Sequence, residues 1–348
     1  MKNQKKENKK GSAKRGFLIA AVVVLALILV LLIVATVFIS GTLSRITRVD
    51  DLDETMSQEE LESILNETEA EDENFTGIVL NPEDVTMPDV PVERVDGDEN
   101  LVHVLLVGQD TYSKTSRSRS DSMILCTLNR SAKTLTLTSF MRDLYVRIPG
   151  YYSHRMNTAY VLDGFDALYD TIEFNFGLVI EHGVAVNFGS FKEVIDAVGG
   201  VEVELTGSEA RHLNNQDYSW GLIEGVNHLD GEQALAYSRI RKLDSDFNRT
   251  SRQRTVIMAL IESAKKQPLT DLYKLVDALI PMVVTDMSNG EIVSLAMEIA
   301  PVLSELTVVT QRIPADGEYR SVMIDGMAVL LPDLEGNRQV LVEAFGKP

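Results

Sequence analysis

Residues 101–140 read LVHVLLVGQDTYSKTSRSRSDSMILCTLNRSAKTLTLTSF and contain three short apolar runs separated by polar residues. Val102–Val107 and Met123–Leu128 are runs typical of buried strands, and Leu135–Phe140 alternates between apolar and polar residues. Asn129–Lys133 fits the turn of a hairpin between the second run and the third. The stretch therefore predicts three strands of one sheet, with the second and third antiparallel.

Downstream, segments with helical spacing alternate with segments of strand character. Helices are expected at Phe165–Phe176, Phe188–Val198, Arg249–Lys265, Asp271–Met282, Asn289–Val302 and Leu334–Phe345, and strands at Val179–Val186, Val201–Leu205 and Leu306–Arg312. Asp230–Gln233 and Ser288–Glu291 carry capping-box patterns that start helices. This alternation predicts an α/β fold, in which a central mixed sheet has helices on both faces as an α-β-α sandwich.

Upstream, Phe17–Ile39 runs for 23 residues without a charge. As a helix it spans about 35 Å, enough to cross a hydrocarbon core of about 30 Å. Residues 1–16 hold seven Lys or Arg against one Glu, which predicts a basic tail on the cytoplasmic side and the rest of the chain outside. A cleaved signal peptide is the alternative, but no A-x-A-like site follows Ile39. We expect one transmembrane helix that anchors the protein in the cell membrane.

Residues 40–100 are expected to form an acidic extracellular stalk. From Asp50 to Asn100 there are 19 Asp or Glu residues against Arg94 alone. Low hydrophobicity with high net charge is typical of a self-repelling spacer, and an acidic cation-binding arm is the alternative. Residues 101–348 then remain, enough for one large domain.

An arginine cluster stands out in a chain whose net charge is -19. Residues Ala236 to Arg254, AYSRIRKLDSDFNRTSRQR, contain Arg239, Arg241, Arg249, Arg252 and Arg254. Arginine binds phosphate or carboxylate through two parallel hydrogen bonds, so the cluster predicts a bound anion. The acidic overall balance argues against nucleic acid. In a strand, Arg239 and Arg241 would share one face and suit a diphosphate; an exposed basic edge strand is the alternative.

In the helix predicted after this cluster, the apolar face continues toward the N-terminus as polar and charged residues. Arg249 and Gln253 lie on the same helical face as Val256 and Leu260. Charged groups that point inward are costly unless paired, and a helix N-terminus favours an anion. Arg249 is therefore expected to contact the anion; pairing with a core carboxylate such as Asp246 is the alternative.

Carboxylates and further arginines flank the three predicted strands. Asp110 ends the first strand, Arg119 and Asp121 precede the second, and Arg142 and Asp143 follow the third. A hairpin of the second and third strands would place the last four at one end of the sheet. Carboxylates beside arginines could hold Mg²⁺ that bridges to phosphate oxygens, although such triplets are often ordinary ion pairs.

The chain resembles the LytR-CpsA-Psr family of bacterial cell-envelope phosphotransferases. The matching segments are LLVGQD (105–110), RSDSMIL (119–125), LTSFMRDLYVRIPG (137–150), FKEVIDAVGGVEV (191–203), LDGEQALAYSRIR (229–241) and DFNRTSRQR (246–254). The resemblance implies transfer of a glycopolymer from a polyprenyl-pyrophosphate carrier to peptidoglycan, with formation of a phosphodiester bond. It also implies that the lipid enters a hydrophobic pocket beside the sheet.

The resemblance also assigns roles to individual residues. Asp110 and Asp121 would hold Mg²⁺ or Mn²⁺. The pyrophosphate would be surrounded by Arg119, Arg142, Arg239, Arg241, Arg249 and Gln253. Arg142, Asp143, Arg239 and Arg241 would act in catalysis, with Asp143 or alternatively Asp121 as the base. The departures from the family pattern, such as Gln109 before Asp110, bear on polymer specificity rather than on reaction type.

Three other functions compete with transfer. A pyrophosphatase would act on the same lipid with water as acceptor, and the sequence does not separate it from a transferase. A non-catalytic membrane-anchored regulator is disfavoured, because about sixteen cytoplasmic residues leave no room for a helix-turn-helix. A sugar-binding module would need exposed aromatic residues, whereas Trp220 is the single tryptophan.

Overall fold

The computed structural model describes residues 44–49, 75–95, 99–109, 111, 117–241, 243, 245–266 and 280–346. The predicted basic tail and membrane anchor, most of the stalk, Asp110 and residues 271–279 of the helix expected at Asp271–Met282 lie outside this part. Within it, no helix is both long and apolar enough to cross a membrane. All helices and strands described below belong to the compact unit Thr47–Pro348.

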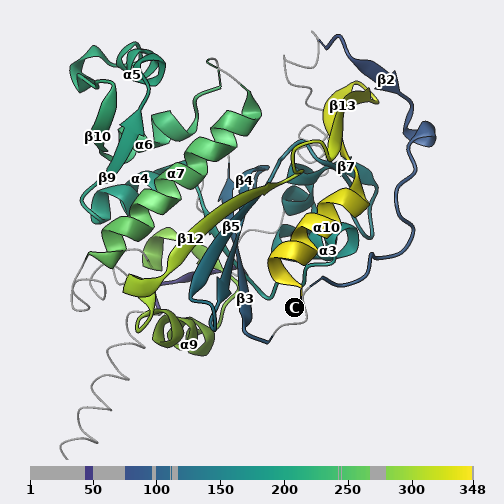
Figure 1. Cartoon of the computed structure of the whole chain (residues 1–348), viewed down its shortest axis with the longest axis horizontal. Coiled ribbons are helices and arrows are strands. Elements are labelled where there is room, and N and C mark those ends of the chain that lie inside the picture. Colours follow the sequence, from purple (N-terminus) through teal and green to yellow (C-terminus); the bar gives the residue numbers. More distant parts are fainter. Residues whose placement is uncertain are drawn as a thin grey trace, which may run out of the picture. The chain divides into compact units, whose positions relative to one another are not determined.

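A mixed sheet of seven strands forms the centre of this unit (Figure 1). Its order is β1 (Thr47–Arg48), β11 (Val284–Thr285), β8 (His182–Val186), β3 (Leu101–Gln109), β4 (Ser120–Asn129), β5 (Thr134–Phe140) and β12 (Thr307–Ile313). The expected hairpin is confirmed, because β4 and β5 are antiparallel with Asn129 opposite Thr134. β8 and β12 run parallel to their neighbours β3 and β5.

Helices α3 (Ala159–Phe176) and α10 (Leu334–Phe345) cover one face of the sheet. Side chains alternate along a strand, and Leu105 and Val107 of β3 point into this core. The contact with α3 is close: a Cβ atom added at Gly183 of β8 would lie 2.3 Å from the Phe165 ring and 2.3 Å from the Tyr169 hydroxyl. A glycine therefore lets the helix approach the sheet here.

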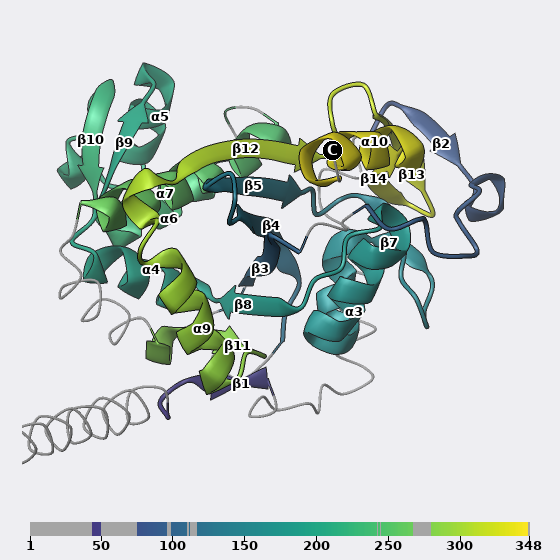
Figure 2. The same ribbon diagram turned by 60° about the horizontal axis from the view of Figure 1, so that its bottom comes forward.

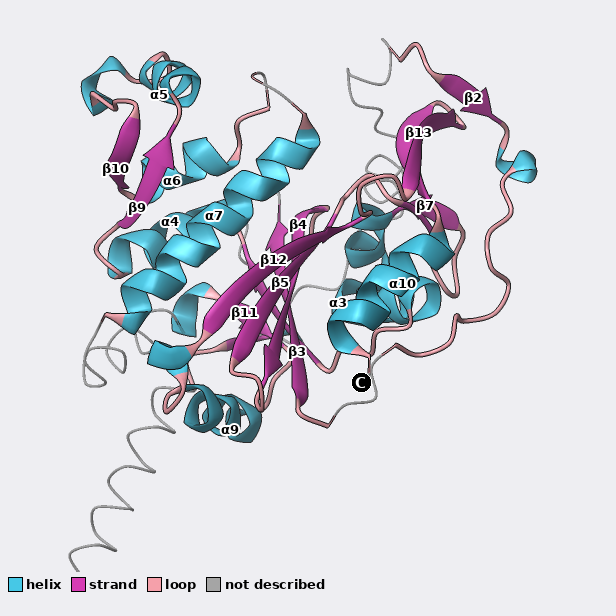
Figure 3. Ribbon diagram, in the orientation of Figure 1, coloured by secondary structure: helices cyan, strands magenta, loops and turns pink. Residues whose placement is uncertain are grey.

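Helices α4 (Phe188–Ala197), α6 (Gly231–Ser238) and α7 (Asp246–Lys265) cover the other face (Figure 2). They share a second core with α5 (Gly207–Asn214) and a separate hairpin of β9 (Val201–Leu205) and β10 (Gly225–Leu229). The strand predicted at Val201–Leu205 therefore forms, but outside the central sheet. Helices on both faces of a mixed sheet confirm the predicted layers (Figure 3).

Several short strands outside the central sheet were not predicted by the sequence analysis. β13 (Tyr319–Ile324) pairs with β14 (Met327–Pro332) and β2 (Ile78–Leu80), and β6 (Tyr145–Arg147) pairs with β7 (Ser153–Arg155). Helix α9 (Asn289–Ile299) starts at the predicted Ser288 box. Short 3₁₀ helices cover Pro82–Asp84, Met156–Thr158, Tyr218–Trp220, Ile280–Met282 and Leu303–Glu305.

The strand expected around Arg239 and Arg241 is not formed. The capping box of Asp230 and Gln233 starts α6, which runs through Ser238, and Arg239 is its C-terminal cap. Local helix propensity and packing against α4 and α7 override the alternating pattern of SRIR. The side chains of Arg239 and Arg241 are therefore not arranged by a strand face.

Candidate active site

A cavity of about 370 Å³ lies between the sheet and helices α4, α6 and α7. In β3, Leu106, Val107 and Gly108 line this cavity, whereas Leu105 does not; Leu105 and Val107 are also part of the core under α3. Most of the lining is apolar: Leu106, Val107, Ile124, Val184, Val186, Phe188, Phe191, Val194, Leu235, Ile257 and Leu260. The cavity is suited to an aliphatic chain, because burial of each CH₂ group contributes about 0.8 kcal/mol.

Polar residues of the same cavity lining include most of the predicted site residues. They are Gln109, Asp121, Ser122, Asn187, Ser238, Arg239, Arg241, Arg249 and Gln253. An apolar interior with arginines in its wall fits an amphiphile that carries an anionic head group. A more open cavity of about 520 Å³ lies beside the first residues of β3 and β8 and contains none of the predicted site residues.

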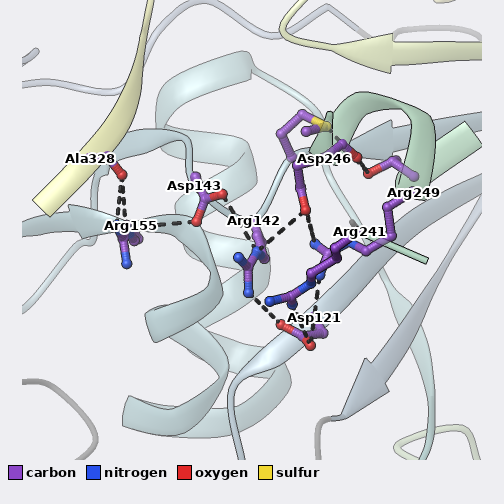
Figure 4. Close-up of polar contacts among 10 residues, drawn as sticks. Asp121, Arg142, Asp143, Arg155, Arg241, Asp246, Arg249 and Ala328 are labelled. Atoms are coloured by element: carbon purple, nitrogen blue, oxygen red, sulfur yellow. Dashed lines mark hydrogen bonds and ion pairs between the residues drawn. The ribbon is translucent and has the colours of Figure 1, made fainter. Parts of the chain in front are cut away.

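Asp121 is surrounded by arginines (Figure 4). Its carboxylate lies 3.0 Å from Nη1 of Arg142, 3.3 Å from Nη2 of Arg241 and 3.9 Å from Nη1 of Arg249. Burial raises the pKa of Asp121, but the three guanidinium charges together outweigh burial and hold the pKa below its usual range. Asp121 is therefore ionised at neutral pH and orders the arginines around it.

Arg249 is almost fully buried and pairs with Asp246 one helical turn before it, at 2.8 Å. The alternative partner considered for Arg249 is thus present, while Arg249 also lines the cavity. Asp246 additionally lies 3.9 Å from Nε of Arg142. Ion pairs therefore link the first turn of α7 to the neighbouring ends of β4 and β5.

Arg142 and Asp143 lie in a layer behind Asp121 and do not line the cavity. Nε of Arg142 is 3.5 Å from the Asp143 carboxylate, and Asp143 is also 3.7 Å from Nε of Arg155. Arg155 in turn donates two hydrogen bonds to the carbonyl oxygen of Ala328 in β14. This chain of contacts fixes Arg142, so the geometry favours a positioning role for Asp143.

Arg239 and Arg241 reach the cavity from the end of α6 and the residues after it. The guanidinium of Arg239 lies 4.2 Å from the centre of the Phe188 ring, which is a cation–π contact at the start of α4. Arg241 binds Asp121, as described above. Both arginines line the cavity, although no strand presents them, and their contact with pyrophosphate stays a prediction.

Arg119 does not line the cavity. It lies close enough to His154 for its charge to help lower the pKa of that histidine to about 4, an effect caused first by burial and then by Arg155. Arg119 therefore lies near His154, and its contact with pyrophosphate stays a prediction.

A buried ion pair that the sequence analysis did not predict supports the arginine segment. Nε of Arg252 lies 2.7 Å from Glu209 of α5, and Nη1 of Arg252 donates to the carbonyl of Ile240, between Arg239 and Arg241. Glu209 also completes the capping box of α5 with Thr206. The pattern Thr206–Glu209 could have indicated a helix start, but not its distant partner on α7.

The residues around Asp121 offer oxygen atoms that suit a hard cation. The Asp121 carboxylate lines the cavity, and the buried Oε1 atom of Gln109, in the residue before Asp110, accepts no hydrogen bond from the described residues. Carboxylate and amide oxygens are ligands that Mg²⁺ prefers. Within the described part, no group of three or more His, Cys, Asp or Glu side chains could hold a metal. A site here would need Asp110, which lies outside that part.

Comparison with known proteins identifies similar chains. Residues 66–342 match the LytR_cpsA_psr family. The polyisoprenyl-teichoic acid–peptidoglycan teichoic acid transferase TagT of Bacillus subtilis is 33% identical over 180 residues, 50% of this chain and 56% of that protein. The transferase TagU of Enterococcus faecalis is 36% identical over 203 residues, 56% of this chain and 64% of that protein.

Solved structures share the fold. The structure titled "TagT bound to LIIa-WTA" has a TM-score of 0.58 and 26% identity, and the match covers 76% of this chain and 100% of that one. The crystal structure of Bacillus subtilis TagV has a TM-score of 0.58 and 28% identity, with 72% of this chain and all of that one covered. The sequence matches to TagT and TagU span less than two thirds of those proteins.

Proposed function

The chain belongs to the LytR_cpsA_psr family, and on that premise we propose that it transfers a glycopolymer from a polyprenyl-pyrophosphate carrier to peptidoglycan. The names of TagT and TagU suggest a teichoic acid as the polymer. The observation that carries the proposal is that one cavity has both an apolar interior and three arginines in its wall, Arg239, Arg241 and Arg249. A lipid pyrophosphate matches this arrangement, because its aliphatic chain fits the apolar interior and its anionic pyrophosphate fits the arginines.

In the proposed reaction, a hydroxyl of peptidoglycan attacks the phosphorus that carries the polymer. A new P–O bond forms, the bond to the polyprenyl phosphate breaks, and the product is a phosphodiester between polymer and peptidoglycan. Phosphoryl transfer asks the protein mainly for positioning and charge stabilisation. Arg239, Arg241 and Arg249 would bind the pyrophosphate oxygens, with Gln253 beside them on α7.

Asp121 and Arg142 would keep these arginines in place. Their ion pair is nearly buried, with 4% and 18% of the Arg142 and Asp121 side chains exposed, and it links the arginine segment to the hairpin ends. Buried groups that are held by several partners need no reorganisation when charge develops in the transition state. Preorganisation of the arginines is the main contribution that we assign to this cluster.

The proton of the attacking hydroxyl needs an acceptor, and Asp143 and Asp121 are the two candidates. Asp121 lines the cavity, but its pKa is held low by three arginines, which makes it a weak base. Asp143 lies behind Arg142 and contacts two arginines. We propose Asp143 as a positioning residue for Arg142, so that in this scheme the proton leaves through Asp121 or solvent.

We also propose that Asp121 and Asp110 hold Mg²⁺, with Mn²⁺ as a substitute. When bound, the ion would neutralise charge on the pyrophosphate oxygens. The support is the chemistry of the oxygen donors at Asp121 and Gln109. Phe17–Ile39 would anchor the protein in the membrane that contains the lipid, with the catalytic domain outside the cell.

Product analysis tests transfer against hydrolysis. The full chain, in detergent or vesicles, is incubated with a lipid-pyrophosphate glycopolymer and with peptidoglycan fragments, and the products are identified by ³¹P NMR and mass spectrometry. The proposal predicts a phosphodiester-linked conjugate and free polyprenyl phosphate. Polymer phosphate released at the same rate with or without peptidoglycan would identify a pyrophosphatase and refute transfer.

A further inference from the structure

Helix α7 has a second charged face, turned away from the lipid-binding cavity. Phe247 and Arg254 are seven residues apart, about two helical turns, so their side chains lie on one face. At about 100° per residue, Arg254 is rotated by about 140° from Arg249. Arg249 and Gln253 line the cavity, whereas Phe247 and Arg254 do not.

Two arginines meet at this second face. Nη1 of Arg254 donates a hydrogen bond of 2.8 Å to Oγ of Ser139 in β5. Arg312 of β12 is the register partner of Ser139 in the parallel β5–β12 pair, so the two residues are neighbours across the sheet. The Arg254 guanidinium therefore lies where α7 contacts β5, next to the β12 residue Arg312, whose charge acts on it.

Two aromatic rings lie next to the Arg312 guanidinium on this face. The guanidinium carbon of Arg312 lies 4.3 Å from the centre of the Phe247 ring, and the centre of the Tyr319 ring is 5.3 Å from that of Phe247. Phe247 and Tyr319 are only partly buried. Partly exposed rings beside guanidinium groups fit a ligand with both an apolar ring face and a negative charge.

The positive charge of this surface is incompletely balanced. Among the described residues, no carboxylate lies within ion-pair distance of Arg254. Arg312 pairs with Asp316, whose side chain is 94% exposed. Burial and then the charge of Arg312 lower the pKa of Arg254, so the two cations oppose each other. A bound carboxylate or phosphate would relieve this repulsion.

The surface adjoins the reacting groups on the side opposite the lipid. Phe247 follows Asp246, which pairs with Arg249, and Ser139 lies three residues before Arg142. In phosphoryl transfer the nucleophile and the leaving group lie roughly in line on opposite sides of phosphorus. The leaving polyprenyl phosphate is on the cavity side of α7 under the proposed function, so the acceptor must approach from the other side.

We propose that Arg254, Arg312, Phe247 and Tyr319 form the acceptor-binding surface of this protein. The arginines bind a carboxylate of a peptidoglycan stem peptide, and a sugar ring of the glycan strand packs against the two aromatic rings. The inference rests on the proposed function, because it assigns a place to the acceptor of that reaction. It gives the second face of α7 a role in substrate selection and leaves lipid binding to the first.

Steady-state kinetics of the double variant Arg254→Ala/Arg312→Ala tests the proposal in the full chain. At saturating donor, the KM for soluble peptidoglycan fragments is expected to rise tenfold or more, while the KM for the lipid-pyrophosphate donor stays within twofold of wild type. Amidation of the fragment carboxylates should raise the acceptor KM of wild type by a similar factor and leave the acceptor KM of the variant unchanged. Arg130→Ala removes an arginine at the far end of the β4–β5 hairpin and is the matched control.

An unchanged acceptor KM in the double variant would overturn the inference, and so would an increase confined to the donor KM, which would assign the surface to the donor polymer. If the double variant does not fold, Arg254→Lys/Arg312→Lys keeps both charges and should raise the acceptor KM less than threefold. Direct calorimetric titration of the fragments decides the binding question without turnover. If wild type binds the fragments and the double variant does not, but wild type forms no conjugate, the proposed function is refuted and the assignment of this surface still holds.

Discussion

Replacing Asp121 by Asn should destabilise the fold and strengthen anion binding at the same time. The Asp121–Arg142 contact at 3.0 Å is nearly buried, and two further arginines lie within 3.9 Å. The gross Coulomb energy of a 3.0 Å pair is about 5.5 kcal/mol at an effective dielectric constant near 20. Asparagine keeps an acceptor and avoids the cost of burying a charge, so the net loss should be about 3 kcal/mol.

That loss corresponds to a fall in melting temperature of roughly 6–12 °C for a domain of this size. The variant also leaves three arginines without their common carboxylate. In EDTA, inorganic pyrophosphate should therefore bind the variant about tenfold more tightly than wild type, equivalent to about 1.4 kcal/mol. The bound anion would restore part of the lost stability.

Thermal unfolding of the full chain, followed by the fluorescence of Trp220, measures both effects with and without pyrophosphate. Glu305→Gln is the matched control, because it removes a carboxylate from an exposed ion pair with Lys133 and should change the melting temperature very little. Equal melting temperatures for Asp121→Asn and wild type would refute the role of Asp121 as the organiser of the arginines. So would an equal stabilisation of both by pyrophosphate.

Three further predictions concern other parts of the site. Glu209→Gln removes the buried partner of Arg252 and should lower the free energy of unfolding by about 2 kcal/mol or more. Transfer should also fall several-fold, because Arg252 holds the backbone of Ile240 between the two cavity arginines. Thermal unfolding and product assays check this, and a variant with unchanged stability and unchanged activity would contradict it. Burial, Arg155 and Arg119 lower the pKa of His154 to about 4, so between pH 7 and pH 4 the unfolded chain takes up a proton that the folded chain does not. Stability should therefore fall as the pH drops through that range, and it should fall less steeply in His154→Asn, as measured by denaturant unfolding at each pH. Excess EDTA should stop transfer, with Mg²⁺ restoring it in wild type but not in Asp110→Asn; undiminished wild-type activity in EDTA would remove the metal from the mechanism.

The longer strands of the central sheet, β3, β4, β5, β8 and β12, and most helices of the domain could be predicted because their patterns are local. The apolar runs at 102–107 and 123–128 are short and flanked by turn residues, which is enough to predict buried strands. A capping box places the start of a helix to within one turn. The segment of Arg239 and Arg241 shows the limit. Its alternation favoured a strand, yet the residues before it continue a helix whose stability comes from packing on α4 and α7.

The site residues could be predicted better than their partners could. Asp121 and Arg142 were brought together by the hairpin, whose register follows from the turn. The ion pair of Arg252 with Glu209 joins two helices 43 residues apart, and the contact of Arg155 with Ala328 depends on β14, which the sequence analysis did not predict. Both depend on tertiary packing that no local pattern records.

Native mass spectrometry of the full chain, extracted in mild detergent, tests most directly whether the cavity is a lipid-pyrophosphate site. The account predicts a bound polyprenyl phosphate or pyrophosphate on wild type. It predicts loss of that mass from Ile257→Trp, which fills the cavity from α7, and its retention in the surface variant Glu305→Gln. Equal lipid occupancy in wild type and Ile257→Trp, or no lipid on wild type even after addition of the donor, would contradict the central claim.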